Sequence, residues 1–157
     1  MSDELLKTLA LFYSLVEKSR VFWILSGSVS LCLQGVDIIP SNDIDILTDE
    51  KGSRKIDQLL HQYRTKKPEF SETDKYRSIF GIYQIGKMQI EVMANFQYKL
   101  LNGNWSKQNQ LHKTLTLDYK GMEIPVLSLN QELAEYTNTG KMGKVELIKA
   151  RLAEEMS

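Results

Sequence analysis

Two aspartates separated by one isoleucine, Asp43 and Asp45, have the residue type and spacing that could do chemistry. On a β-strand, residues i and i+2 share a face, so both carboxylates would lie opposite Ile44 and Ile46. Their Cα atoms would be roughly 6.5–7 Å apart, which lets the carboxylate oxygens converge on one metal ion or on a close pair of ions. Hard oxygen ligands of this kind favour Mg²⁺ or Mn²⁺.

The apolar neighbours of the two aspartates indicate a buried segment, where unpaired like charges would cost several kcal/mol. We therefore expect a cation beside them. Zinc is not favoured, because His61 and His112 each stand alone and Cys32 is a single thiol in an apolar stretch. The alternative interpretation is an exposed strand face whose acids are merely solvated.

A second candidate feature is Gly27-Ser28, which lies between the apolar run 21–25 and the helical pattern of residues 29–34. A helix N-terminus presents unpaired N–H groups and partial positive charge, so it can hold a phosphate. Glycine lets the backbone approach the phosphate and serine adds a hydroxyl donor. The absence of Gly-Lys-Ser/Thr sets aside the P-loop nucleoside triphosphatases, and an ordinary turn is the alternative.

The elements that must position these residues are read from hydrophobic spacing and from turn signals. The expected elements are helix 3–19 with Asp3 as N-cap, strand 21–25, helix 29–34, strand 43–47, helix 53–64 ending at a Lys66-Lys67-Pro68 boundary, a hairpin of 79–85 and 88–93, a polar loop or frayed helix over 95–111, a hairpin of 113–119 and 122–127, helix 129–136 with a Ser128/Gln131 capping box, and helix 142–156. This order predicts an α/β fold, with a small mixed sheet flanked by helices.

Length and composition limit the possible classes of protein. With 157 residues we expect one domain over 1–157, with a core of about 1–127 and C-terminal helices in 128–157. The 20 basic and 20 acidic residues balance, which argues against an extended nucleic-acid surface. No apolar run approaches the roughly 20 residues that span a membrane, and the N-terminus lacks the basic region of a signal peptide. We therefore expect a cytoplasmic protein.

The run Trp23–Ser28, followed by Ser41–Ile46, resembles the nucleotidyltransferase superfamily that includes DNA polymerase beta, small antibiotic nucleotidyltransferases and minimal nucleotidyltransferases. The pattern of that superfamily is hydrophobic-Gly-Gly/Ser, a gap, Asp-hydrophobic-Asp/Glu-hydrophobic, and a third acidic residue on a later strand. Glu91 fits the third position, between Ile90 and Val92. The resemblance covers roughly residues 21–93.

The resemblance implies that Asp43, Asp45 and Glu91 hold two Mg²⁺ or Mn²⁺ ions, and that Glu91 helps to activate an acceptor hydroxyl. That hydroxyl would attack the α-phosphate of a nucleoside triphosphate in line, and pyrophosphate would leave. The enzyme would be a nucleotidyltransferase that transfers a nucleoside monophosphate, with ATP among the candidate donors.

The same resemblance implies that Gly27, Ser28 and Ser41 form the nucleotide-binding turn. Lys141 and Lys144, near the break at Gly140, would contact the triphosphate. The alternative for these lysines is a solvated helix face.

Two functional hypotheses remain open at this level. The first is the enzyme; the second is a catalytically weak nucleotide-binding or regulatory module with the same fold, of the kind found in toxin–antitoxin pairs. The acceptor is unknown in either case. Because the short chain leaves little room for an acceptor domain, we expect either a small acceptor or one bound with help from a homodimer or another protein partner.

Overall fold

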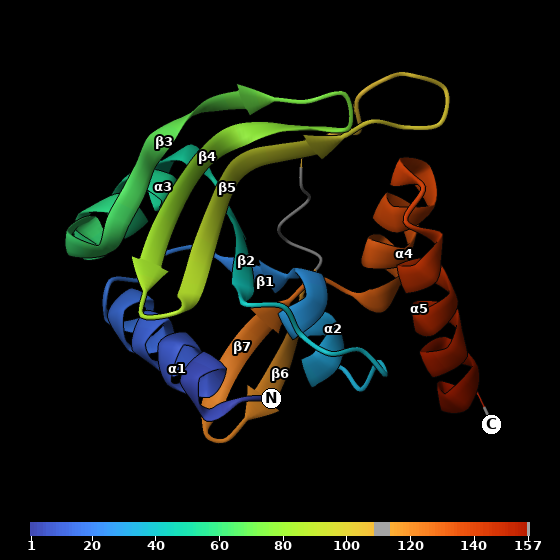
Figure 1. Ribbon diagram of the computed structural model, residues 1–157, viewed down its shortest axis with the longest axis horizontal. Helices are drawn as coiled ribbons and strands as arrows, with labels where there is room; N and C mark the ends of the chain where they lie inside the picture. The colour runs from blue at the N-terminus through green and yellow to red at the C-terminus, as the bar shows by residue number, and fades with distance from the viewer. Residues whose placement is uncertain (109–113, 157) are drawn as a thin grey trace.

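The computed structural model describes residues 1–108 and 114–156, which form a seven-stranded mixed sheet with helices packed against it (Figure 1). The strands lie in the order β3-β4-β5-β2-β1-β7-β6. The elements are α1 (Asp3–Lys18), β1 (Ile24–Ser26), α2 (Gly27–Leu33), β2 (Asp43–Thr48), α3 (Glu50–Leu59), the 3₁₀ helix η1 (His61–Tyr63), β3 (Arg64–Glu72), β4 (Tyr76–Ile85), β5 (Met88–Tyr98), β6 (Leu115–Tyr119), β7 (Met122–Val126), α4 (Leu129–Thr139) and α5 (Met142–Glu155). The predicted α/β class is confirmed.

Parallel and antiparallel pairs meet at the centre of the sheet. β2 runs parallel to β5 and antiparallel to β1, while β1 runs parallel to β7. The two predicted hairpins, β4–β5 and β6–β7, are antiparallel. A tight turn cannot join parallel neighbours, so β2 and β5 are separated along the chain by α3, η1, β3 and β4. This crossover brings residues that are distant in sequence to the middle of one sheet.

The main hydrophobic core lies between one face of the sheet and the helices α1 and α3. Ile44 and Ile46 of β2 are fully buried in it, and Phe12 of α1 contacts Trp23 edge to face with ring centroids 5.1 Å apart. A second cluster joins α2, α4 and α5 through residues such as Leu31. Figure 1 shows α4 and α5 side by side at the end of the molecule away from α3.

The region after α3 differs from the prediction. The expected helix 53–64 is α3 followed by η1, and the expected boundary at Lys66-Lys67-Pro68 lies inside the strand β3. β3 is at the edge of the sheet, and its register with β4 shifts at two places between Arg64 and Glu69. Proline lacks the N–H of a strand ladder and is tolerated at edges and bulges, so Pro68 does not end the strand.

The predicted polar segment 95–111 begins with more regular structure than expected. Residues 95–98, predicted as loop or frayed helix, belong to β5. Trp105 bridges to Lys99, and its ring lies beneath the guanidinium of Arg77 at 4.5 Å. The rest of the predicted segment, with the start of the second hairpin and His112, reaches into residues outside the described ranges, whereas His61 is exposed.

Across the described residues, no helix combines the length and the apolar character needed to cross a membrane.

Candidate nucleotide-binding and catalytic site

The register of three neighbouring strands brings the predicted acids together. Asp45 of β2 lies opposite Glu91 of β5 on one side and opposite Ser26 of β1 on the other. Neighbouring strands are about 4.8 Å apart, so these three residues form a row across the sheet. Asp43 lies two residues back on β2, opposite Gln89. The structure therefore pairs Glu91 with Asp45 directly and places Asp43 at the end of the same strand.

The alternation along β2 explains why the carboxylates face away from the main core. Ile44 and Ile46 share one face of the strand, as predicted; both are 0% exposed and belong to the core cluster that includes residues of α1 and α3. Leu47, on the same face as the acids, belongs to a different small cluster with Phe96. Burial of the two isoleucines thus fixes the register, because a slip by one residue would force the acids into the core.

The strand-to-helix turn places Gly27 directly against Asp45. Gly27 is the first residue of α2, which begins two residues earlier than predicted, and its φ is +74°. A Cβ at this position would overlap Asp45 Oδ2. Both the left-handed backbone and the space beside the carboxylate therefore require glycine.

Ser28 and Ser41 connect this turn to the start of β2. The Ser41 backbone N–H donates to Ser28 Oγ at 2.9 Å, and the two hydroxyls are 3.1 Å apart. The Asp43 N–H in turn donates to Ser41 Oγ at 3.2 Å. Within the described chain neither serine lines the cavity beside Asp45, so the observed role of this network is to hold the loop that precedes Asp43.

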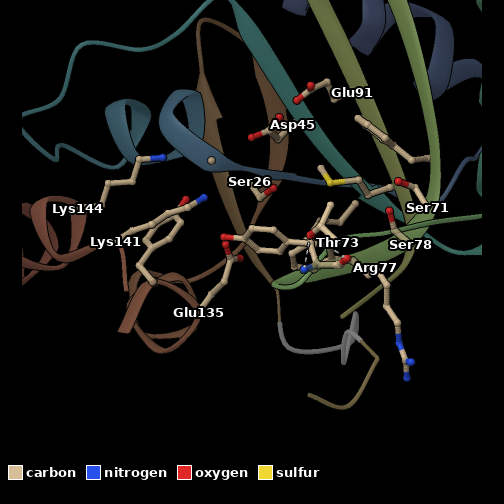
Figure 2. Close-up of a pocket in the computed structure, with 17 residues that line it drawn as sticks. Ser26, Asp45, Ser71, Thr73, Arg77, Ser78, Glu91, Glu135, Lys141 and Lys144 are labelled. Carbon is tan, nitrogen blue, oxygen red and sulfur yellow. Dashed lines mark hydrogen bonds between the residues drawn. The ribbon is translucent and has the colours of Figure 1, made fainter. Parts of the chain in front are cut away.

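A cavity of about 280 Å³ opens beside Asp45 and Glu91 (Figure 2). In Figure 2, Lys141, Lys144 and Glu135 gather on the side of α4 and α5. The walls also include hydroxyl, apolar and cationic side chains from the sheet, from the turn between β3 and β4 and from α4, namely Ser26, Leu47, Ser71, Thr73, Tyr76, Arg77, Ser78, Phe80, Met93, Phe96 and Tyr136. The structure therefore brings the two predicted lysines to the same cavity as the acids.

Aromatic rings hold both lysine ammonium groups in place. Lys141 Nζ lies 4.8 Å from the centroid of the Tyr76 ring, and Lys144 Nζ lies 4.9 Å from that of Tyr136. A ring face attracts a cation through its quadrupole. By contrast Lys149, further along α5, is exposed and does not line the cavity.

The electrostatics around Asp45 favour a bound cation. Burial raises the pKa of the Asp45 carboxyl well above its usual range; Glu91 and Asp43 raise it further, and Lys144 lowers it. Asp45 Oδ1 is buried and has no hydrogen-bond partner among the described residues. Such a group costs free energy unless something binds it.

A divalent cation fits this donor set through its oxygen ligands. Asp45 Oδ1 is an unpartnered oxygen, Glu91 is adjacent in register, and carboxylate oxygens suit Mg²⁺ and Mn²⁺. Over the described ranges, however, no three His, Cys, Asp or Glu side chains already converge as a metal site. The arrangement is thus a paired Asp45 and Glu91 with Asp43 nearby, without a preformed cage of three ligands.

Two buried acids on α4 were missed from the sequence. Glu132 is 0% exposed and accepts a hydrogen bond from the Gly27 N–H at 2.7 Å; Glu135 is 8% exposed and lines the cavity. Burial raises the pKa of Glu135 to about 7, although Lys141 and Lys144 lower it. A signal was present, because Glu132 lies three residues after Leu129 on the apolar face of the helix.

The mixed sheet presents an Asp-hydrophobic-Asp strand beside a third acid and next to a Gly-Ser turn, which is the arrangement that the sequence resemblance to nucleotidyltransferases predicts. The sequence matches the aminoglycoside-2''-adenylyltransferase family over residues 8–151. The chain belongs to this family, and is therefore a nucleotidyltransferase. No curated protein matches the sequence.

Solved structures share the fold over nearly the whole chain. A proposed nucleotidyltransferase from Thermotoga maritima is 35% identical with a TM-score of 0.82, covering 98% of this chain and 96% of its own. The lincosamide antibiotic adenylyltransferase LnuA, solved with lincomycin, is 16% identical with a TM-score of 0.62, covering 96% and 98%. ANT(2'')-Ia, solved with adenylyl-2''-tobramycin, is 8% identical with a TM-score of 0.59, covering 98% and 92%. The last two likenesses concern the fold alone.

Proposed function

We propose that this chain is a cytoplasmic, divalent-metal-dependent nucleotidyltransferase that moves the nucleoside monophosphate of an NTP, most simply ATP, to a hydroxyl acceptor and releases pyrophosphate. The observation that carries this proposal is the Asp45–Glu91 pair, with its unpartnered buried oxygen, at the same cavity as Lys141 and Lys144. Family membership supports adenylyl transfer, because the family is described as an adenylyltransferase family.

In this proposal the acidic residues bind the cations and the basic residues bind the triphosphate. Asp45 and Glu91, with Asp43, hold the cations; two Mg²⁺ or Mn²⁺ ions would supply electrostatic stabilisation of the attacking and leaving oxygens. Lys141 and Lys144 neutralise the triphosphate, and Gly27 leaves room for the Asp45 carboxylate beside the turn.

The acceptor hydroxyl attacks the α-phosphorus in line and loses its proton to a carboxylate of the site, for which Glu91 is the candidate. Pyrophosphate then leaves on the side opposite the attacking oxygen, and the new phosphodiester remains on the acceptor. The cavity beside the acids has a volume of about 280 Å³, a size that suits a small acceptor. We therefore place the hydroxyl of a small molecule first, and an acceptor bound with help from a second subunit next.

The first test is nucleotide binding, measured by isothermal titration calorimetry with and without Mg²⁺. We expect Mg²⁺-dependent ATP binding by the wild type, a loss of at least about tenfold in affinity in Lys144→Ala, and no change in the control Lys149→Ala. We also expect the double variant Asp43→Asn plus Asp45→Asn to lose ATP binding. Equal binding by all of these variants would leave the acids as solvated groups and contradict the proposal.

The second test is transfer. Label from α-labelled ATP is followed onto a panel of hydroxyl compounds that includes lincomycin and tobramycin, which accompany the related structures. Transfer to any member supports the enzyme. Mg²⁺-dependent binding with no transfer to a broad panel, alone or with co-purifying proteins, would favour the regulatory module.

A further inference from the structure

We infer that Glu132 is a positioning residue for the nucleotide-binding turn: from α4 its carboxylate holds the Gly27 backbone, and so keeps Gly27 against Asp45. This inference rests on the proposed function, because its effect is on nucleotide binding. Glu132 does not line the cavity, so it would act through Gly27 and would not touch the substrate.

The contact joins two distant parts of the chain in the interior. The Gly27 N–H donates to Glu132 Oε1 at 2.7 Å, across 105 residues of sequence, and both residues are buried. The Tyr136 hydroxyl donates to the same oxygen at 3.3 Å. A hydrogen bond between a buried amide and a carboxylate is strong and directional, so it fixes the position of the Gly27 backbone relative to α4.

Packing alone does not explain an acid at this position. The neighbours on this face of α4, Leu129 and Tyr136, belong to a hydrophobic cluster with α5, and an apolar residue would extend it. Burial raises the pKa of Glu132 well above its usual range, and its Oε2 has no hydrogen-bond partner among the described residues. A buried acid with an unpartnered oxygen is costly, so hydrophobic packing does not account for it and the acid indicates another role.

Gly27 lies between the two unsatisfied acids of the described chain. On one side Glu132 Oε1 accepts its N–H, and on the other Asp45 Oδ2 occupies the space where a Cβ would stand. Asp45 Oδ1 and Glu132 Oε2 are the buried side-chain oxygens without partners in residues 1–108 and 114–156. Movement of Gly27 would therefore change the surroundings of Asp45 directly.

One consequence concerns the predicted phosphate contact of Gly27. Its N–H is already engaged by Glu132, so it is not free to donate to a phosphate. Gly27 would serve by its lack of a side chain and by its fixed position. Binding donors for the triphosphate would come from other groups, among them Lys141 and Lys144.

The experiment compares Glu132→Leu, which removes the acceptor, with Glu132→Gln, which keeps a carbonyl oxygen at the same reach. Glu146→Leu, at an exposed position on α5, is the matched control. We expect Glu132→Leu to weaken Mg²⁺-ATP binding by about tenfold or more, while the variant still unfolds in a cooperative thermal transition. Glu132→Gln should restore most of the affinity, and the control should leave it unchanged.

A purely structural residue would give the opposite pattern, with a lower melting temperature and unchanged affinity in Glu132→Leu; that result overturns the inference. Equal loss of affinity in the Gln and Leu variants also overturns it. If the Leu variant does not fold, Glu132→Met makes the same comparison with a flexible side chain.

Amide hydrogen exchange at Gly27 provides a readout that needs no nucleotide. Strong protection in the wild type and in Glu132→Gln, lost in Glu132→Leu, supports the positioning role. Failure of the wild type to bind Mg²⁺-ATP, with this exchange pattern intact, refutes the proposed function while leaving the hold of Glu132 on the turn established. Unchanged protection in the Leu variant refutes the hold itself.

Discussion

Glu135 should make the stability of the protein fall as the pH rises toward 8. Burial raises the pKa of this carboxyl from its usual 4.5 to about 7 in the folded state, with Lys141 and Lys144 opposing the rise. Between these two pKa values the folded state binds more protons than the unfolded state. The contribution of Glu135 is therefore fully favourable below about pH 4.5 and is lost as the pH rises through about 7.

The size of the effect follows from the displacement of the pKa. A rise from 4.5 to about 7 corresponds to about 3 kcal/mol in total, of which about 2 kcal/mol is lost between about pH 5.5 and pH 8. Glu135→Gln keeps the size of the side chain and removes the titration. The wild type should thus lose about 2 kcal/mol more stability than this variant over the same pH window.

The assay is urea unfolding followed by circular dichroism at several pH values in constant ionic strength, with the exposed Glu146→Gln as control. The stability of the wild type relative to Glu135→Gln should fall steadily from about pH 5 and level off above about pH 7, and the control should track the wild type. A difference that is constant from pH 5.5 to 8, or that grows in the opposite direction, would show that burial does not hold the proton on Glu135 and would refute the reasoning.

Four further substitutions, which include one control, test the residues that support the site. Gly27→Ala and Gly121→Ala both place alanine at a left-handed φ, at a strain of about 1–3 kcal/mol each, but only at Gly27 does the new Cβ meet Asp45. Calorimetry should therefore show that Gly27→Ala loses Mg²⁺-ATP binding and that Gly121→Ala keeps it. Equal binding by the two variants would contradict the close approach of Gly27 to Asp45. Ser128→Ala, which removes the capping box of α4, should lower unfolding free energy by about 1 kcal/mol, and no change would mean that tertiary packing alone fixes the start of the helix. Ile46→Ala should cost about 2–5 kcal/mol in urea unfolding; a cost under about 1 kcal/mol would mean that this face of β2 is less tightly packed than its full burial indicates.

The local arrangement of the site residues could be predicted because it depends on patterns of a few consecutive residues. The alternation of Asp43, Ile44, Asp45 and Ile46 assigns the two faces of β2, and the structure has them as predicted. The capping box at the start of α4 is likewise a local signal that the structure confirms. In each case the deciding interactions lie within a few residues.

The features that could not be predicted depend on long-range pairing. The direct opposition of Asp45 and Glu91 depends on the parallel register of β2 with β5, which no local pattern specifies. The position of Glu132 on the apolar face of its helix signals burial, but its hydrogen bond to Gly27 depends on where α4 packs. β3 was missed because Pro68 reads as a breaker, although an edge strand tolerates it.

The most direct test of the central claim is transfer of label from α-labelled ATP to an acceptor, with Asp45→Asn compared against Asp49→Asn. Asp49 caps α3 and accepts from the Gly52 N–H, so its variant controls for the loss of a carboxylate close to the site in sequence. We predict Mg²⁺-dependent transfer by the wild type, a loss of about a hundredfold or more in Asp45→Asn, and retained transfer in Asp49→Asn. Transfer that persists in Asp45→Asn at the wild-type rate, or that is indifferent to removal of divalent cations, would contradict the account.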